Sequence, residues 1–249
     1  MSPCGSEDQW IRSLLAELAP ASADLICGPG DDCAVTKHSE SHFQLLKTDA
    51  IIENRHYLPG TCPQRIGWKA IARVISDFAA MGGRPQWFLV TLALAESVQL
   101  AEAQEIYRGM ARCLSQFGGH IVGGDTTRAP SGSTMLSIAA TGMIEPSRVV
   151  YRHGGQVDDL LLVTGTLGGS LAGHHLDFHP RLAESQWLVE HFKPHAMMDV
   201  SDGLAMDLPR LARASKCGFE IDHAQLPCRI PGNIHAALCD GEDLSLIHI

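Results

Sequence analysis

The sequence lacks several features that would place it in a common class of protein. Aromatic residues make up only 6% of the 249 residues, and apolar runs such as residues 87–95 are far shorter than the roughly 20 residues that a membrane-spanning helix needs. The first ten residues contain no basic region followed by an apolar stretch, so we expect no secretory signal. These absences predict a cytoplasmic protein with no membrane partner.

Paired cysteines and an excess of basic residues are missing as well. The eight cysteines are scattered and form no C-x-x-C, which favours reduced thiols over a disulfide framework. The 19 Lys and Arg are outnumbered by 28 Asp and Glu, and the net charge is −9. Because neutralisation of phosphates drives nucleic-acid binding, we do not expect nucleic acid as a partner. The acidic excess favours either a plain surface or a carboxylate-rich site that holds cations.

The common nucleotide-binding motifs are absent too. The chain contains neither G-x-x-x-x-G-K-[ST] nor a complete G-x-G-x-x-G, so a site for ATP would have to differ from the P-loop and Rossmann modes. What is present is a hydrophobic fraction of 45%, which is ample for one large domain or two moderate ones.

Apolar periodicity predicts helices and strands that alternate in two halves of the chain. We expect helices over residues 64–81, 98–117, 170–178 and 204–215, and a first helix opened by Ser6 and ended by Pro20. We expect strands over residues 43–48, 87–94, 121–122, 136–144, 160–164 and 196–200. The pattern predicts an α/β or α+β fold with a boundary near Pro146, dividing the chain into domains of residues 1–147 and 148–249.

Aspartates carry the clearest chemical signal. Most of them lie within apolar runs or at their ends: Asp31, Asp32, Asp49, Asp77, Asp125, Asp199 and Asp202. A carboxylate in such a place is partly desolvated, and several that converge would repel one another unless cations bind between them. Hard oxygen ligands suit Mg²⁺. Each aspartate alone could be a cap or turn residue, but together they predict a magnesium site.

Glycines precede or follow some of these segments. Gly123 and Gly124 stand before Asp125 and would let the backbone approach a phosphate closely. The run from Gly165 to Gly169 could present amides to an anion between a strand and a helix. A tight turn would explain each of these glycine pairs equally well.

Several segments, in order, resemble the thiamine-monophosphate kinases, which belong to a superfamily with aminoimidazole ribonucleotide synthetase, selenophosphate synthetase and a hydrogenase maturation factor. The resemblance runs from about residue 28 to residue 243. The segments that carry it are Gly30-Asp-Asp-Cys-Ala-Val, Lys47-Thr-Asp, Glu53-Asn-Arg-His-Tyr, residues 67–82, Gly123-Gly-Asp-Thr-Thr and Asp199-Val-Ser-Asp-Gly-Leu.

The resemblance implies a two-domain, synthetase-like fold whose N-terminal mixed sheet forms a homodimer, with ATP in a cleft at the dimer interface. It also implies direct transfer of the γ-phosphoryl group of ATP to thiamine monophosphate, assisted by Mg²⁺. The implied metal positions are Asp31, Thr48, Asp49, Asp77, Asp125, Asp199 and Asp202. The implied nucleotide contacts are Tyr107, Gly124, Asp125, Arg152 and Ser201. The implied substrate contacts are His56 and Glu242.

The sequence departs from the family pattern in three places. Lys47 stands where the family usually has a small hydroxyl residue, and it could either replace a cation or point away. Val157-Asp158-Asp159 replaces the usual Pro-Gly-Asp, so we expect an altered turn. The resemblance stops at Asp243, so we expect an incomplete C-terminal α/β domain, an uncovered face on its sheet, a weak enzyme, and a non-native segment at residues 244–249.

One further expectation concerns two basic residues of the helix over residues 64–81. Lys69 and Arg73 are expected on the polar side of their helix. Two alternative functions remain open at this point. The chain could be another ATP-dependent synthetase of the superfamily, or a non-catalytic protein that binds nucleotide or thiamine phosphate.

Overall fold

The computed structural model describes residues 7–18, 22–130 and 132–248. The first helix, α1, spans Glu7–Leu15, and Ser6 and Pro20, which we expected at its ends, lie outside the described residues. In the part of the chain that is described, no helix combines the length and the apolar character needed to cross a membrane. The seven cysteines in these ranges all carry free thiols.

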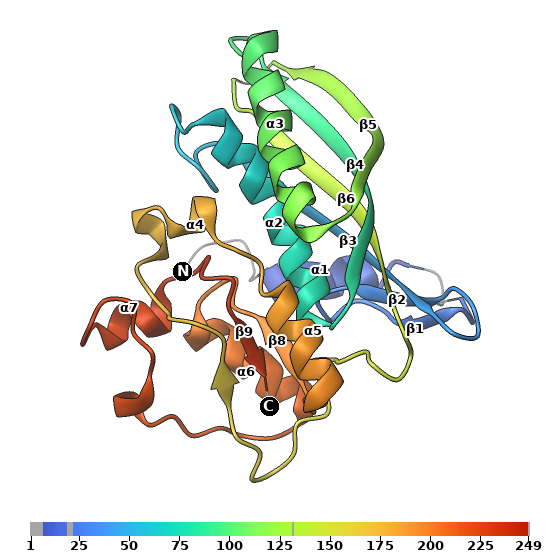
Figure 1. Cartoon of the computed structure of the whole chain (residues 1–249), viewed down its shortest axis with the longest axis vertical. Helices are drawn as coiled ribbons and strands as arrows, with labels where there is room; N and C mark the ends of the chain where they lie inside the picture. Colours follow the sequence, from blue (N-terminus) through green and yellow to red (C-terminus); the bar gives the residue numbers. More distant parts are fainter. Residues whose placement is uncertain (1–6, 19–21, 131, 249) are drawn as a thin grey trace.

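A six-stranded mixed sheet forms the larger part of the molecule (Figure 1). Its order is β1 (Leu25–Cys27), β2 (Ala34–Lys37), β3 (Phe43–Ile52), β6 (Met135–Ile144), β4 (Arg84–Ala95) and β5 (His120–Ala129). All neighbouring pairs are antiparallel except β4 and β5, which are parallel and are connected through helix α3 (Leu100–Phe117). A parallel pair needs such a crossover.

The strands are longer than their apolar patterns predicted. The expected strand at residues 43–48 continues to Ile52, and the expected strand at 121–122 extends from His120 to Ala129. Backbone pairing with β6 and β4 extends them through glycines and polar residues that show no alternation. The short strands β1 and β2 were not predicted.

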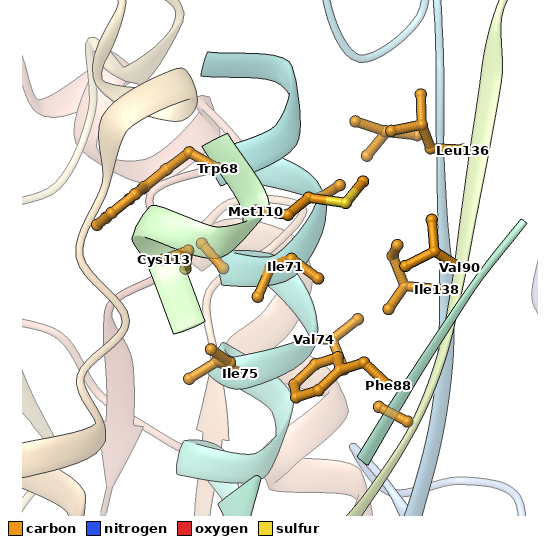
Figure 2. Packing of buried hydrophobic residues seen from close by; sticks show 14 of the residues in the cluster. Trp68, Ile71, Val74, Ile75, Phe88, Val90, Met110, Cys113, Leu136 and Ile138 are labelled. Carbon is orange, nitrogen blue, oxygen red and sulfur yellow. The ribbon is translucent and has the colours of Figure 1, made fainter. Parts of the chain in front are cut away.

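Helices α2 (Pro63–Ala80) and α3 cover one face of this sheet, and both agree closely with the predicted ranges. Figure 2 shows side chains of the two helices packed against those of β4 and β6. The helices approach unusually closely at two glycines. A Cβ at Gly67 would lie 1.9 Å from the backbone oxygen of Ile106, and one at Gly109 would lie 1.9 Å from that of Gln64. Glycine is therefore required at both positions.

The opposite face of the large sheet is open in the described chain, as Figure 1 shows. Leu46, Trp87, Leu89 and Val122 are exposed there, with Leu89 and Val122 half or more accessible to solvent. These side chains line a shallow hollow of about 490 Å³. A contiguous apolar patch of this kind is typical of an interaction surface.

A second, three-stranded antiparallel sheet lies below the first in Figure 1. Its order is β7 (Leu162–Val163), β9 (Leu246–His248) and β8 (Met197–Asp199). The surrounding helices are α4 (His174–Asp177), α5 (Leu182–His191), α6 (Leu204–Ser215) and α7 (Ile234–Cys239). The expected helix over residues 170–178 is instead divided into a short 3-10 turn and α4, because Gly173 has φ of 128°. The domain boundary after residue 147 stays a prediction.

One expectation about the second half, that a face of its sheet is uncovered, is wrong. Residues 246–248 do not leave the sheet uncovered but form its central strand, and every residue of β8 and β9 is buried. The α6 side chains Leu204 and Leu208 pack on one face with Ile247, while Met197 and Leu246 pack on the other with α2 and α5. The described part of the chain therefore covers both faces, although a hollow of about 610 Å³ remains beside α6.

The turn that departs from the family pattern keeps a left-handed residue. Asp158, at the position where the resemblance leads us to expect glycine, has φ of 73°. Aspartate tolerates this conformation better than most residues because its short side chain can hydrogen-bond locally.

Candidate active site

The candidate site lies along the C-terminal part of α2, which packs against both sheets. The helix contacts β3 and β6 of the large sheet and β8 of the small one. Most of its side chains are therefore buried, including the polar Ser76 and Asp77. A mid-helix aspartate in this position can meet acidic residues from both halves of the chain.

Three buried carboxylates do meet there. Oxygens of Asp32, Asp77 and Asp199 all lie within 4.8 Å of one another. They come from the turn before β2, from α2 and from the end of β8. We call these three residues the acidic triad.

Each member of the triad has a polar partner. The Nζ of Lys47 lies 2.7 Å from Oδ1 of Asp77, and the Oγ of Ser76 donates to Oδ2 of Asp199 at 2.8 Å. The guanidinium of Arg152 donates to both carboxylate oxygens of Asp32. These contacts satisfy individual carboxylates but supply only two full positive charges to three acidic groups.

Burial governs the ionisation of the triad. Desolvation raises the pKa of Asp77 well above its usual value, with repulsion from Asp199 adding to the effect and the charge of Lys47 opposing it. Desolvation, together with repulsion from Asp32, raises the pKa of Asp199 to about 7. The triad therefore favours bound protons or bound cations.

A second cluster of charged residues adjoins the first. Arg73 bridges two carboxylates, with its Nε 2.8 Å from Oδ2 of Asp49 and its Nη1 2.7 Å from Oε1 of Glu242. The Nζ of Lys69 lies 3.0 Å from Oε2 of Glu242 and donates to the backbone oxygen of His56 at 2.6 Å. This arrangement, which we call the bridging cluster, links the two predicted substrate contacts, His56 and Glu242.

Lys69 and Arg73 do form a polar stripe on α2, but this stripe is covered by other parts of the chain. The Lys69 side chain is 1% exposed and that of Arg73 is 16% exposed. They are buried because α2 lies between two layers, so its polar stripe faces the second half of the chain and not solvent.

Local contacts also define the state of His56. Its Nδ1 accepts a hydrogen bond from the backbone N–H of Ile52 at 2.9 Å, which places the proton of the neutral ring on Nε2. Burial, reinforced by the positive charge of Arg73, lowers the pKa of His56. The ring is therefore neutral near pH 7 and presents an Nε2–H donor.

Five of the predicted metal residues lie outside the acidic triad. Asp31 accepts from the backbone N–H of Arg152 at 3.1 Å, and Asp202 pairs with Arg210 at 2.6 Å. Thr48 is exposed on the open face of the sheet, because it alternates with Lys47 and Asp49 along β3. Asp49 is held in the bridging cluster.

Asp125 is set apart from the triad by the sheet itself. The register of the sheet gives the separation. Asp49 on β3 is opposite Ile138 on β6, and Ile138 is opposite Val90 on β4. Val90 in turn pairs with Gly124 on β5, the residue before Asp125. Asp125 is therefore separated from Asp49 by three strand spacings, or about 14 Å. Its carboxylate accepts a hydrogen bond from the N–H of Thr126 and is otherwise on an exposed edge strand.

The predicted nucleotide contacts divide between two places. Tyr107 lines a hollow of about 490 Å³ between α3 and the ends of β4 and β5. Close by, Gly124 has φ of 150°, and a Cβ there would lie 1.8 Å from the oxygen of Val90, so only glycine fits. Arg152, by contrast, lies at the triad, and Ser201 is in the loop after β8.

Sequence reasoning missed one buried acid that shapes this loop. Asp207 accepts hydrogen bonds from the backbone N–H groups of Ser201 and Asp202 at 2.9 and 2.8 Å. Burial raises its pKa to about 6. Its position in the first turn of α6 was the available signal, since an acid there can hold the preceding loop.

Comparison with known proteins places these features in a family. Residues 30–144 match the family model of the AIR synthase related protein N-terminal domain, and residues 168–245 match that of the C-terminal domain. The thiamine-monophosphate kinase of Synechococcus elongatus is 33% identical over 276 residues, covering 96% of this chain and 80% of the relative. That of Escherichia coli K12 is 32% identical, covering 98% of this chain and 82% of the relative.

Solved structures agree with the sequence comparison. A complex of AaThiL with AMPPCP and TMP is 29% identical, with a TM-score of 0.84, covering 97% of this chain and 82% of the other. The thiamine-monophosphate kinase of Stenotrophomonas maltophilia is 27% identical, with a TM-score of 0.76, covering 96% of this chain and 83% of the other. On the strength of these matches, the chain belongs to the thiamine-monophosphate kinase family.

Proposed function

We propose that this chain transfers the γ-phosphoryl group of ATP directly to the phosphate of thiamine monophosphate, with Mg²⁺ bound at the acidic triad. The observation that carries the proposal is the convergence of Asp32, Asp77 and Asp199, whose oxygens lie within 4.8 Å of one another beside the bridging cluster. Phosphoryl transfer depends on positioning and charge neutralisation more than on covalent chemistry. The names of the relatives and the ligands of the AaThiL complex support the same donor and acceptor.

The side chains of the triad fit a magnesium ion. They offer hard carboxylate oxygens, and burial already disfavours charge on Asp77 and Asp199, so a cation would stabilise their ionised forms. Bound Mg²⁺ supplies neutralisation of the charge that develops on the transferred group. The other metal residues that the resemblance implies lie outside the triad, and we propose them as metal contacts separate from it: Asp31, Thr48, Asp49, Asp125 and Asp202.

The nucleotide is proposed to reach from the hollow beside Tyr107 toward the triad. The hollow is lined by the apolar side chains of Leu92, Leu94 and Val98 as well as by Tyr107, which suits a flat base. Gly124 lets the backbone of β5 come close to a phosphate. Arg152 has the planar fork that pairs with phosphate, and Ser201 would contribute from the loop held by Asp207.

The acceptor is proposed to bind at the bridging cluster. The Nε2–H of His56 can donate to the phosphate of thiamine monophosphate while its Nδ1 is held by Ile52. Arg73 and Lys69 place positive charge beside the same point and hold Glu242 in position. These residues bind and orient the acceptor, and none of them needs to form a covalent bond with it.

A homodimer through the open sheet face is part of the proposal. The exposed side chains of Leu46, Trp87, Leu89 and Val122 would be buried there. Asp125 and the Tyr107 hollow lie toward the far edge of the same sheet, and ATP would occupy a cleft at the interface between two copies.

Product analysis tests the proposal directly. The chain is incubated with ATP, Mg²⁺ and one acceptor at a time: thiamine monophosphate, thiamine, or a substrate of the related synthetases. We expect release of ADP and formation of thiamine diphosphate with thiamine monophosphate alone, and loss of both in Asp77→Asn. ADP release only with a synthetase substrate would overturn the proposal in favour of another superfamily activity. Binding of ATP without turnover of any acceptor would favour a non-catalytic role.

A further inference from the structure

Lys47 is directed into the acidic triad and not toward solvent. It lies on β3 between Leu45 and Asp49, so its side chain points to the face that α2 covers. The side chain is 23% exposed, and its Nζ lies 2.7 Å from Oδ1 of Asp77, which is 9% exposed. The sequence left open whether this lysine points away from the site, and the geometry excludes that alternative.

The charge of Lys47 acts on the whole triad. Burial by itself would lower the pKa of Lys47, but attraction to Asp77, with further contributions that include Asp32, raises it above its usual value. The same charge opposes the rise in the pKa of Asp199 that burial causes. An ammonium group in this place is a permanent monovalent cation with a compact, point-like charge.

A lysine and a divalent ion compete for the same oxygen. The lone pairs of Asp77 Oδ1 that would coordinate a metal are engaged by an ammonium at hydrogen-bond distance. Asp32 and Asp199 are engaged differently, by Arg152 and by the hydroxyl of Ser76, and the hydroxyl brings no net charge. Besides the guanidinium of Arg152 at Asp32, the triad therefore already contains an ammonium cation at Asp77.

We propose that the ammonium of Lys47 occupies one cation position of the acidic triad, so that the chain with bound nucleotide takes up one divalent ion fewer than its Lys47→Ser variant. Lys47 is a positioning residue in this proposal, since it acts on Asp77 and touches no reacting atom in the described structure. The inference rests on the proposed function only in taking the triad as a site for divalent ions.

Metal stoichiometry tests this inference without reference to turnover. Mn²⁺ binding is measured by equilibrium dialysis and electron paramagnetic resonance, with a nonhydrolysable ATP analogue present, in the wild type, Lys47→Ser, Lys47→Arg and Lys37→Ser. Lys37 lies on the adjacent strand of the same sheet, where it pairs with Glu40 at the surface. We expect one additional ion per chain in Lys47→Ser, and wild-type stoichiometry in Lys47→Arg and Lys37→Ser.

The outcomes separate the inference from the function on which it rests. The inference about Lys47 would be overturned if the wild type and a cooperatively melting Lys47→Ser variant bound the same number of Mn²⁺ ions per chain. An additional ion in Lys37→Ser would overturn it as well. If Lys47→Ser fails to fold, Lys47→Met removes the charge while keeping an unbranched side chain, and it must also show the added ion. Failure of the wild type to phosphorylate thiamine monophosphate would overturn the proposed function but would leave the difference in stoichiometry unchanged.

Discussion

Arg73 offers the sharpest test of how the two halves of the site are joined. Its guanidinium spans Asp49 on β3 and Glu242 near the end of the described chain, which are 193 positions apart in sequence. Replacing it by alanine removes both contacts and leaves two partly buried carboxylates without this partner. Glu242 retains Lys69, whereas Asp49 loses its guanidinium partner.

The expected cost follows from these contacts. A hydrogen bond to a charged group contributes about 1.5–3 kcal/mol to stability, and the shortest bonds of Arg73 to the two carboxylates are 2.8 and 2.7 Å long. The three side chains are 16–21% exposed, so water screens them in part and the lower end of that range applies. We therefore expect Arg73→Ala to lower the free energy of unfolding by about 3 kcal/mol, the sum of two contacts of about 1.5 kcal/mol each.

Urea denaturation followed by circular dichroism measures this loss, with Arg73→Lys and Arg108→Ala as matched variants. A lysine brings one point charge and can meet only one of the carboxylates, so Arg73→Lys should lose about half as much. Arg108 pairs with Glu105 on the surface of α3, and its removal should cost under about 0.5 kcal/mol. A loss in Arg73→Ala no greater than that in Arg108→Ala would refute the reasoning.

Four further predictions concern metal, acceptor, assembly and backbone. Chelation by EDTA should weaken binding of an ATP analogue, and Asp77→Asn should reduce turnover far more than stability; isothermal titration that gives the same affinity with and without EDTA would contradict the metal assignment. His56→Ala should raise the KM for thiamine monophosphate about tenfold, the equivalent of one hydrogen bond of about 1.4 kcal/mol, with little change in that for ATP; equal changes in both would make His56 a structural residue. Leu89→Glu, at a side chain that is 50% exposed, should leave folding intact but give a monomer by light scattering; an unchanged mass would rule out the open face as the interface. Gly124→Ala should destabilise the fold by about 2 kcal/mol, more than Gly118→Ala, because both have positive φ but only Gly124 has a backbone atom in the way; equal losses in thermal melts would show that φ alone matters.

Local patterns determined a large part of this structure. The apolar spacing over residues 64–81 predicted α2, which spans Pro63–Ala80, because helical periodicity is a property of neighbouring residues. The acidic segments likewise predicted that several aspartates converge, and the structure brings three of that set, Asp32, Asp77 and Asp199, into the triad. Family membership, too, could be inferred from short segments in order.

Which acid of a neighbouring pair enters the site could not be read from the sequence. Asp31 and Asp32 are adjacent aspartates that the pattern of acidic segments does not separate, and the family resemblance implied Asp31 as the metal ligand. In the structure Asp32 joins the triad, while Asp31 accepts from the backbone of Arg152. The backbone of a turn decides which side chain points inward, and here that turn contacts a residue 120 positions away.

The surroundings of a helix or strand were decided only by the tertiary structure. Lys69 and Arg73 form a polar stripe that is solvent-facing in an isolated helix but is covered here by the second half of the chain. Asp125 belongs to the same set of acidic segments as Asp49, yet the strand order places β6 and β4 between them. Lys47 reads as a simple departure from a family pattern, and it is the packing of α2 against β3 that places its charge 2.7 Å from Asp77. The sequence by itself determines the chemical character of each side chain. Long-range packing decides which other side chain it contacts, because the partners lie on elements that only the folded chain brings together.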